Sequence, residues 1–275
     1  MFEFAFMRRT ILVGFLLAIS FPLIGIVMVS RKTSMMGDAL SHTSLTGVAL
    51  GLILGINPSL AAILICVISA FSIESLRSKF PQYGDMATAV IMSIGLGLAS
   101  ILSDFTPGGN SLESYLFGSI SSSSPMDVLY AIILCFCTIF VSIKFYASLL
   151  GISIDKNIAR LDGVKVNLIN ALFTLLTAVT VALSTKSIGA LLISSLLVIP
   201  VASALFLARS YREVYIFALA LSLVSMFLGL VLSWYFEIKP GGAIILIASL
   251  GLLLSAFFAY VRKKKQKSQL RKINT

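Results

Sequence analysis

The sequence predicts an all-α membrane protein, a polytopic bundle of about nine transmembrane helices. Two observations support this: the composition is strongly apolar, and the apolar residues form runs long enough to cross a bilayer. Of 275 residues, 58% are hydrophobic and only 12% are charged, about half of the roughly 25% charged residues usual in soluble domains. The mean hydropathy is +1.03. Because this number of charged residues could not cover the surface of a globular protein, lipid must be the solvent for most of the chain.

The positions of the spans follow from the apolar runs. A transmembrane helix needs about 20 apolar residues to cross the hydrocarbon core, and nine runs approach or exceed that length. They lie near Ile11–Val29, Ala39–Ile56, Leu60–Leu76, Ala87–Leu102, Val128–Leu149, Leu168–Ser184, Ile188–Ala208, Tyr215–Phe236 and Gly241–Val261. No small-x-small cleavage site precedes Arg31, so we expect the first run to be a retained span. A total of eight spans stays open.

The basic residues predict the orientation of the single membrane domain, residues 1–275. With the N-terminus outside, the inner segments hold most of the Lys and Arg residues, in addition to the basic tail 262–275. These inner residues are Arg31, Lys32, Arg77, Lys79, Lys144, Lys156, Arg160, Lys165, Arg209 and Arg212. Cytoplasmic loops are enriched in Lys and Arg, so we expect a cytoplasmic C-terminus. Arg8 and Arg9 oppose this, and would lie inside if the first segment were re-entrant or the span count even.

Charge, cysteines and missing motifs exclude several classes of function. The net charge is +10, and its densest cluster, Arg262–Lys267, follows an apolar run. That position is typical of a cytoplasmic stop in contact with anionic membrane lipid, not of nucleic-acid binding. Cys66, Cys135 and Cys137 lie within apolar runs and predict small buried side chains. The sequence has no Walker A, HExxH or GxSxG motif, so we expect neither an enzyme nor ATP hydrolysis by this chain.

One pair of ionisable residues is the main candidate for chemistry. Asp38 and His42, the only histidine, are four residues apart, so on a helix they share a face with β-carbons about 5–6 Å apart. A carboxylate and an imidazole can bind one cation at about 2.0–2.2 Å, and they suit zinc and other first-row transition metals. Two ligands are too few, so others would come from another span, a backbone carbonyl or water. The alternative is a hydrogen-bonded Asp–His pair at a helix end.

Glycine and proline positions predict how the helices pack. Gly47, Gly51 and Gly55 repeat at four-residue spacing, which allows another helix to approach closely. We therefore expect the helix with the candidate pair to be central in the bundle. Gly189 and Pro200 interrupt a later apolar run. Pro200 removes a backbone donor and predicts a kink, which is common in helices that line a transport path.

Charged residues elsewhere lie near the ends of the runs. Glu74 and Asp85 border an inner loop and predict solvated or ion-paired charges. The connection Ser103–Asp127 is outside and contains no Lys or Arg. The connection Gly151–Asn167 is inside, mixed in charge and compatible with a short amphipathic helix up to Gly163. Such a segment is typical of a cytoplasmic docking element, although an ordinary charged linker has the same composition.

These motifs resemble a known family, the membrane permeases of bacterial ABC importers for zinc, manganese or iron. The stretch Gly37-Asp-Ala-Leu-Ser-His42, followed by Gly47-Val-Ala, is similar to the family's signature at the second span. So is the stretch from Asp155-Lys-Asn-Ile-Ala-Arg-Leu-Asp-Gly163 through Ser187 to Ala202. The match in order, spacing and length covers essentially the whole chain. One departure is Thr46, where family members often have proline, and threonine should leave the helix straighter.

The resemblance implies a permease of the ABC-importer type with several partners. It implies a homodimer in the bacterial cell membrane, a cytoplasmic ATP-binding subunit and an extracytoplasmic metal-binding protein. No cofactor is bound permanently, and Zn²⁺, or next Mn²⁺, is the transported ion. By position, Asp38 and His42 would contact the metal. The segment Asp155–Val164 would couple to the ATPase, through Asp155, Ala159, Asp162 and Gly163, while Gly189 and Pro200 would mark the path or a kink.

Other interpretations stay open at this point. A secondary, ion-coupled metal carrier would need no ATPase, but often shows inverted repeats and more intramembrane acids. A structural or assembly subunit would use Asp38 and His42 only as a helix-end pair. The predicted topology also places this pair near the cytoplasmic end of its span. Either the site is an inner gate, or the segment Thr33–Gly47 is broken and re-enters the membrane.

Overall fold

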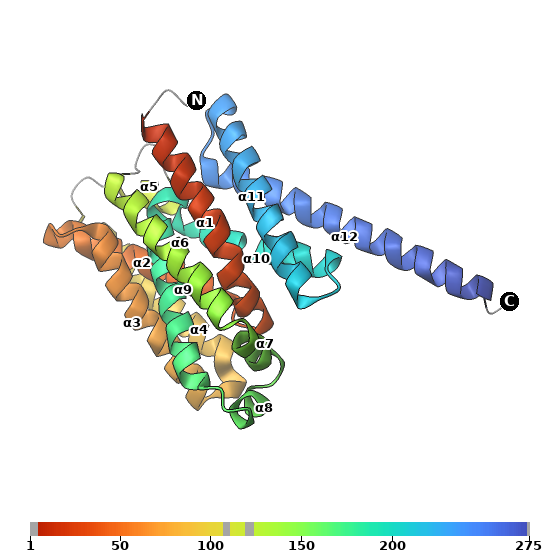
Figure 1. Cartoon of the computed structure of the whole chain (residues 1–275). Coiled ribbons are helices and arrows are strands. Elements are labelled where there is room, and N and C mark those ends of the chain that lie inside the picture. The colour runs from red at the N-terminus through yellow and green to blue at the C-terminus, as the bar shows by residue number, and fades with distance from the viewer. Residues whose placement is uncertain (1–4, 107–110, 119–123, 274–275) are drawn as a thin grey trace.

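The computed structural model describes residues 5–106, 111–118 and 124–273, and every regular element in these ranges is a helix (Figure 1). The long helices are α1 (Ala5–Ser30), α2 (Met35–Leu54), α3 (Pro58–Lys79), α4 (Gly84–Ser103), α6 (Pro125–Lys144), α9 (Val166–Ile188), α10 (Ala190–Leu207), α11 (Tyr211–Phe236) and α12 (Pro240–Ile273). The short helices are η1 (Pro81–Tyr83), α5 (Ser111–Phe117), α7 (Tyr146–Ile154) and α8 (Lys156–Leu161). The predicted all-α helical bundle is confirmed.

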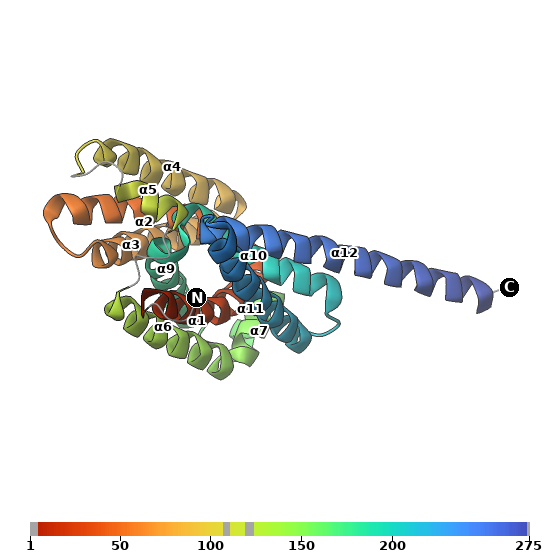
Figure 2. The ribbon, with the colours of Figure 1, turned by 90° about the horizontal axis from the view of Figure 1, so that it is seen from above.

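Eight of the long helices are long and apolar enough to cross a membrane. The remaining one, α2, is more polar because it contains Asp38, His42 and several Ser and Thr residues. It is also enclosed by protein: 13 of its 20 residues are buried, against 4 of 20 in α4. The view from above shows α2 among α3, α4, α5 and α9 (Figure 2). The expected central position of this helix is confirmed.

Polar side chains of α2 bind its neighbours. Thr46 Oγ1 donates a hydrogen bond to the backbone carbonyl of Gly95 in α4 at 2.7 Å. The hydroxyl oxygens of Ser44 and Thr185, the latter in α9, lie 2.8 Å apart. All of these groups are buried. Because lipid offers no hydrogen-bond partners, a helix this rich in hydroxyl groups is stable in a bilayer only when other helices surround it.

The predicted close approach at the spaced glycines occurs between α2 and α3. A Cβ atom on Gly47 would lie 2.5 Å from the Cα of Ala62, and one on Gly51 would lie 2.7 Å from the Cα of Pro58. Gly55 follows α2 in the left-handed conformation, with a φ of +66°, which glycine adopts without steric cost. The glycines therefore place two backbones in contact and then reverse the chain within a short turn.

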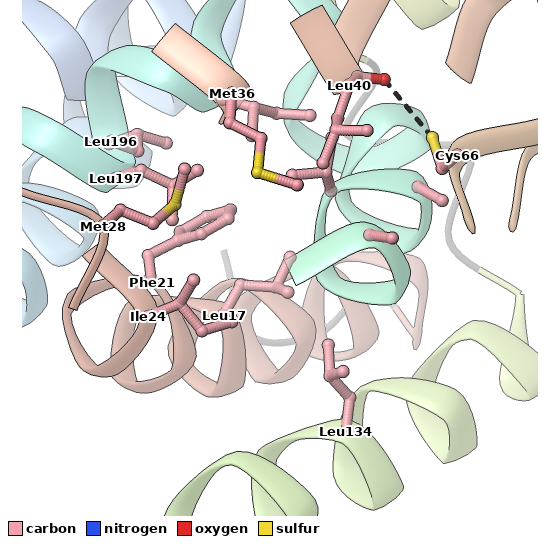
Figure 3. Packing of buried hydrophobic residues seen from close by; sticks show 14 of the residues in the cluster. Leu17, Phe21, Ile24, Met28, Met36, Leu40, Cys66, Leu134, Leu196 and Leu197 are labelled. Carbon is pink, nitrogen blue, oxygen red and sulfur yellow. Dashed lines mark hydrogen bonds between the residues drawn. The ribbon is translucent and has the colours of Figure 1, made fainter. Parts of the chain in front are cut away.

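A continuous apolar core lies between the central helices. Figure 3 shows Leu17 and Phe21 of α1 close to Met36 of α2 and Leu197 of α10, and all four are buried. The Cys66 thiol of α3 donates to the backbone carbonyl of Leu40 at 3.3 Å. Cys66 and Cys135 are thus small buried side chains, as predicted. The prediction was wrong for Cys137, which is exposed because it lies two residues from Cys135 and so on another face of α6.

The two ends of the bundle differ in the segments that they gather. Figure 1 shows α8 at the end opposite to the start of α1. This end, called the α8 end below, also holds the α1–α2 turn, the end of α3 and the start of α9. The far part of α12 projects away from the other helices in both views (Figures 1 and 2).

One predicted span, Val128–Leu149, was wrong in its extent. The helix α6 ends at Lys144, the backbone turns at Phe145 with φ −103° and ψ 16°, and α7 follows. Leu149 and Ile152 of α7 are buried against the bundle. Their apolar character therefore reflects packing at the α8 end, and does not lengthen the spanning helix.

Candidate functional site

The candidate pair Asp38 and His42 lies in the first two turns of α2, on one face of the helix. Asp38 Oδ1 and His42 Nε2 are 3.8 Å apart, and their side chains are 32% and 14% exposed, respectively. The helix is unbroken from Met35 to Leu54, so the alternative of a broken, re-entrant segment is wrong. The pair lies near the α8 end, as the predicted topology required.

The geometry of the pair is compatible with a shared cation. A distance of 3.8 Å is longer than a hydrogen bond, so Asp38 and His42 are not a hydrogen-bonded pair. Two ligand atoms bound to one ion at about 2.0–2.2 Å with tetrahedral angles are about 3.3–3.6 Å apart. A small rotation of either side chain therefore brings both atoms onto one ion.

The pair alone does not complete a coordination sphere. Within the described ranges, no group of three or more His, Cys, Asp or Glu side chains is close enough to bind one metal ion. The hydroxyl of Ser41 is buried and donates to the backbone carbonyl of Asp38 at 2.7 Å. His42 Nδ1 is buried without a hydrogen-bond partner, which costs about 1–3 kcal/mol for such a group. For a metal to bind here, further ligands would have to come from outside this set of side chains.

The exposed stripe of α2 opens toward the α8 end. Met35, one turn before Asp38, is 65% exposed, whereas Thr46, one turn after His42, is 3% exposed. Exposure thus decreases from one helical turn to the next along the same face. An ion on Asp38 and His42 would be accessible from the α8 end and separated from the opposite end by Thr46 and its contact with α4.

The residues of the predicted docking segment have identifiable roles in α8. Asp155 is the N-cap: its Oδ1 accepts hydrogen bonds from the backbone N–H groups of Asn157 at 2.7 Å and Ile158 at 3.4 Å. Ala159 is 2% exposed and anchors α8 to the core. The exposed Asp162 is the C-cap of α8. Gly163 has a φ of +80°. The short helix predicted up to Gly163 is present, and its docking role stays a prediction.

The short helices α7 and α8 also present apolar side chains to the outside. Ile154, Ile158 and Leu161 are 76%, 57% and 87% exposed. An exposed cluster of large apolar side chains at the end of a bundle is typical of a contact surface for another protein.

Gly189 and Pro200 lie in and after the turn between α9 and α10. Gly189 has a φ of +100°, and a Cβ there would be 2.5 Å from the backbone nitrogen of Gly118. Only glycine fits this close contact between two backbone segments. Pro200 is buried inside α10, which continues as a helix on both sides of it. A role of either residue in a path or kink stays a prediction.

The acidic residues Glu74 and Asp85, at the ends of membrane helices, form ion pairs, as expected. Arg31 Nη2 and Glu74 Oε1 are 3.4 Å apart, and Arg77 Nη1 and Asp85 Oδ1 are 3.8 Å apart. A shorter pair at the opposite end was not predicted: Lys186 Nζ donates to Asp127 Oδ2 at 2.7 Å. Its signal was a lysine at the end of one apolar run and an aspartate at the start of another.

A polar helix with two metal-type ligands, enclosed by apolar helices, is the architecture of a membrane transport protein. Comparison with known families gives the particular family. The model of the ABC 3 transport family matches residues 3–259, so the chain belongs to the ABC 3 transport family. The resemblance to metal-ion ABC importer permeases is thereby confirmed.

Named relatives are similar over almost their whole length. The chain is 34% identical over 255 residues to a "Probable metal transport system membrane protein" of Treponema pallidum, covering 92% of this chain and 96% of the relative. It is 31% identical over 261 residues to the high-affinity zinc uptake system membrane protein ZnuB of Haemophilus influenzae, covering 94% and 98%. It is 29% identical over 266 residues to the manganese import system permease protein ScaB of Streptococcus gordonii, covering 95% and 96%.

A solved structure has the same fold. PsaBC from Streptococcus pneumoniae, determined in complex with a Fab, contains a chain that superposes with a TM-score of 0.82 at 27% identity, covering 92% of this chain and 91% of that chain. The bundle is therefore that of a multi-span ABC permease.

Proposed function

We propose that this chain is the membrane permease subunit of an ATP-driven importer for a divalent transition-metal ion, with zinc as the first candidate and manganese as the second. The observation that supports this most directly is the Asp38–His42 pair, placed 3.8 Å apart on a polar helix that the bundle encloses. An imidazole with a carboxylate selects for transition metals over magnesium and calcium. Relatives named for zinc and for manganese are consistent with either ion.

A homodimer supplies the missing ligands in this proposal. The stripe of α2 with Asp38 and His42 is open in the single chain. A two-fold axis next to this stripe would bring the same two side chains of a second copy to the same ion. Four ligands of this kind complete a tetrahedral sphere. Water or a backbone carbonyl would extend the sphere for a larger ion such as manganese.

The helix α8 is the proposed docking element for the ATP-binding subunit. Asp155 and Gly163 fix its two ends, and Ala159 attaches it to the core, so that it moves with the bundle. The apolar side chains of Ile158 and Leu161 are exposed and available to a partner. In this arrangement the α8 end faces the cytoplasm of a bacterial cell, the C-terminus is inside, and a metal-binding protein delivers the ion at the opposite end.

Radioactive zinc uptake tests the proposal. Cells would co-express the chain with its ATP-binding subunit and binding protein, and wild type would be compared with Asp38→Ala and His42→Ala at equal membrane expression. Met35→Ala, on the same stripe of α2, is the matched control. We expect both site variants to lose uptake and the control to retain it. Uptake that persists in both site variants would refute the metal site, and uptake without the ATP-binding subunit would favour an ion-coupled carrier.

A further inference from the structure

A second polar site lies at the α8 end, separate from the candidate metal pair. It is a cavity of about 720 Å³ between the α1–α2 turn, α3, α8 and the start of α9. Four cationic side chains and one acidic side chain are among its lining residues. They are Arg31, Arg77, Lys156, Arg160 and Glu74. Because these residues come from three separate parts of the sequence, the concentration of charge arises only in the folded chain.

The single acid does not balance the cations. Glu74 accepts a hydrogen bond from Arg31 at 3.4 Å, which leaves three cationic side chains around the same space. Arg77 donates to the backbone carbonyl of Lys32 at 3.3 Å, and Lys32 is held in the left-handed conformation with a φ of 54°. The acid that faces Arg77, Asp85, is 86% exposed and 3.8 Å away. The cavity therefore has an excess of positive charge.

Polar atoms without partners line the same cavity. The side chain of Arg31 is only 7% exposed, yet its Nε is buried without a hydrogen-bond partner, and so are Arg77 Nη1 and Asn170 Oδ1. The two guanidinium nitrogens are donors and the amide oxygen is an acceptor, and buried polar atoms of either kind normally have a partner, because an unsatisfied one costs about 1–3 kcal/mol. Two guanidinium groups with free donors are the usual means by which proteins bind phosphate.

The electrostatic environment of the cavity also favours an anion. Partial burial lowers the pKa of the Lys156 ammonium, and the nearby Arg31 guanidinium lowers it further. Burial likewise lowers the pKa of Arg31, an effect that Glu74 partly offsets. Mutual repulsion of this kind is relieved when a negative group enters between the cations.

We propose that this cavity binds a phosphate group, supplied either by an anionic phospholipid of the cytoplasmic leaflet or by soluble phosphate. The cavity lies where α1 and α3 end and α2 and α9 begin. This position, at the ends of membrane helices, is the depth at which lipid headgroups lie. Lys156 and Arg160 are four residues apart and share one face of α8, whereas Ile158 and Leu161 lie on the other. A protein docked on the apolar face of α8 therefore leaves the phosphate site free.

Lipid titration of the full-length chain in a neutral detergent tests the site. Phosphatidylglycerol and phosphatidylcholine would be compared by native mass spectrometry, and inorganic phosphate by calorimetry. The double variant Lys156→Gln/Arg160→Gln should bind phosphatidylglycerol about 30-fold more weakly, since each basic residue near a membrane surface contributes about 1 kcal/mol. The matched control Lys79→Gln/Lys144→Gln removes two charges at the same end, outside the cavity, and should change the affinity less than about threefold.

A gain of affinity provides the second test. Glu74→Gln removes the only acid among the described residues that line the cavity. The amide oxygen of the glutamine still accepts a hydrogen bond from Arg31, so we expect the fold to be retained. We expect about fivefold tighter binding of the anion. If the chain binds phosphatidylglycerol more tightly than phosphatidylcholine, the phosphate group belongs to a lipid. If it binds only inorganic phosphate, and the cavity variants change that affinity, the ligand is a soluble anion. The proposal would be overturned if the chain bound both lipids equally and did not bind inorganic phosphate. It would also be overturned if the control variant lost as much affinity as the cavity variant.

Discussion

The contact between α2 and α3 at Gly47 gives the sharpest stability prediction. In Gly47→Ala the new Cβ would lie 2.5 Å from the Cα and 2.9 Å from the backbone nitrogen of Ala62, and 2.8 Å from the carbonyl oxygen of Ala61. All three atoms belong to the backbone, so no side-chain rotation relieves the overlap. Ordinary contacts between such atoms are about 3.5–4.0 Å, so the two helices must separate by about 1 Å.

The expected cost follows from that separation. Overpacking of this kind costs about 1–3 kcal/mol, and alanine recovers about 0.5–1 kcal/mol relative to glycine within a helix. The net loss is about 1–2 kcal/mol, which corresponds to a Tm lower by about 2–8 °C for a chain of this size. Because His42 lies five residues before Gly47 on the same helix, metal uptake should fall as well.

Fluorescence-detected size-exclusion chromatography after heating measures the Tm in detergent. Gly97→Ala is the matched control, because a Cβ on Gly97 meets no atom within 4 Å. The control should leave the Tm unchanged or raise it slightly, through the gain in helix propensity. If Gly47→Ala were as stable and as active as the control, the direct backbone contact between α2 and α3 would be refuted.

Three further predictions concern other parts of the bundle. Thr46→Val removes the hydrogen bond to the Gly95 carbonyl and should lower the Tm by about 1–4 °C, since such bonds contribute about 0.6–1 kcal/mol in membranes; an unchanged Tm would contradict the bond. Asp127→Asn removes the charge that pairs with Lys186 at 2.7 Å and should lower the Tm by about 2–10 °C, whereas Asp127→Glu should recover part of the loss. Leu161→Glu places a charge at an 87% exposed position, so it should weaken co-purification of the ATP-binding subunit at an unchanged Tm, and full co-purification would count against docking on α8.

The sequence predicted the long helices because the bilayer requires apolar runs of a fixed length. The prediction failed at Phe145, where the run continues but the helix does not, since composition alone does not separate a spanning segment from one buried at the end of a bundle. The central position of α2 was predictable from Gly47 and Gly51, because only small residues allow such contacts. The hydrogen bond of Thr46, in contrast, was not predictable, because its partner Gly95 lies in another helix.

The candidate metal pair was predictable because Asp38 and His42 are neighbours on one helix and need no tertiary structure to meet. The cavity at the α8 end was not predictable in the same way. Its basic residues are ordinary members of the inner Lys and Arg set, and Arg31 and Arg160 are 129 positions apart in the sequence. Only the fold, which brings α8 to the end of the bundle where α3 ends and α9 begins, places them around one space.

The polarity of α2 has a consequence for how the protein is made. It is not among the eight helices that are apolar enough to cross a membrane, so we expect α2 to insert into lipid inefficiently on its own. The turn Gly55–Asn57 joins α2 to α3, and the backbone of α2 at Gly47 and Gly51 is in close contact with the backbone of α3. We expect the two to enter the membrane together as a helical hairpin. A nascent chain that stops before α3 should leave α2 outside the hydrocarbon, accessible to a soluble protease.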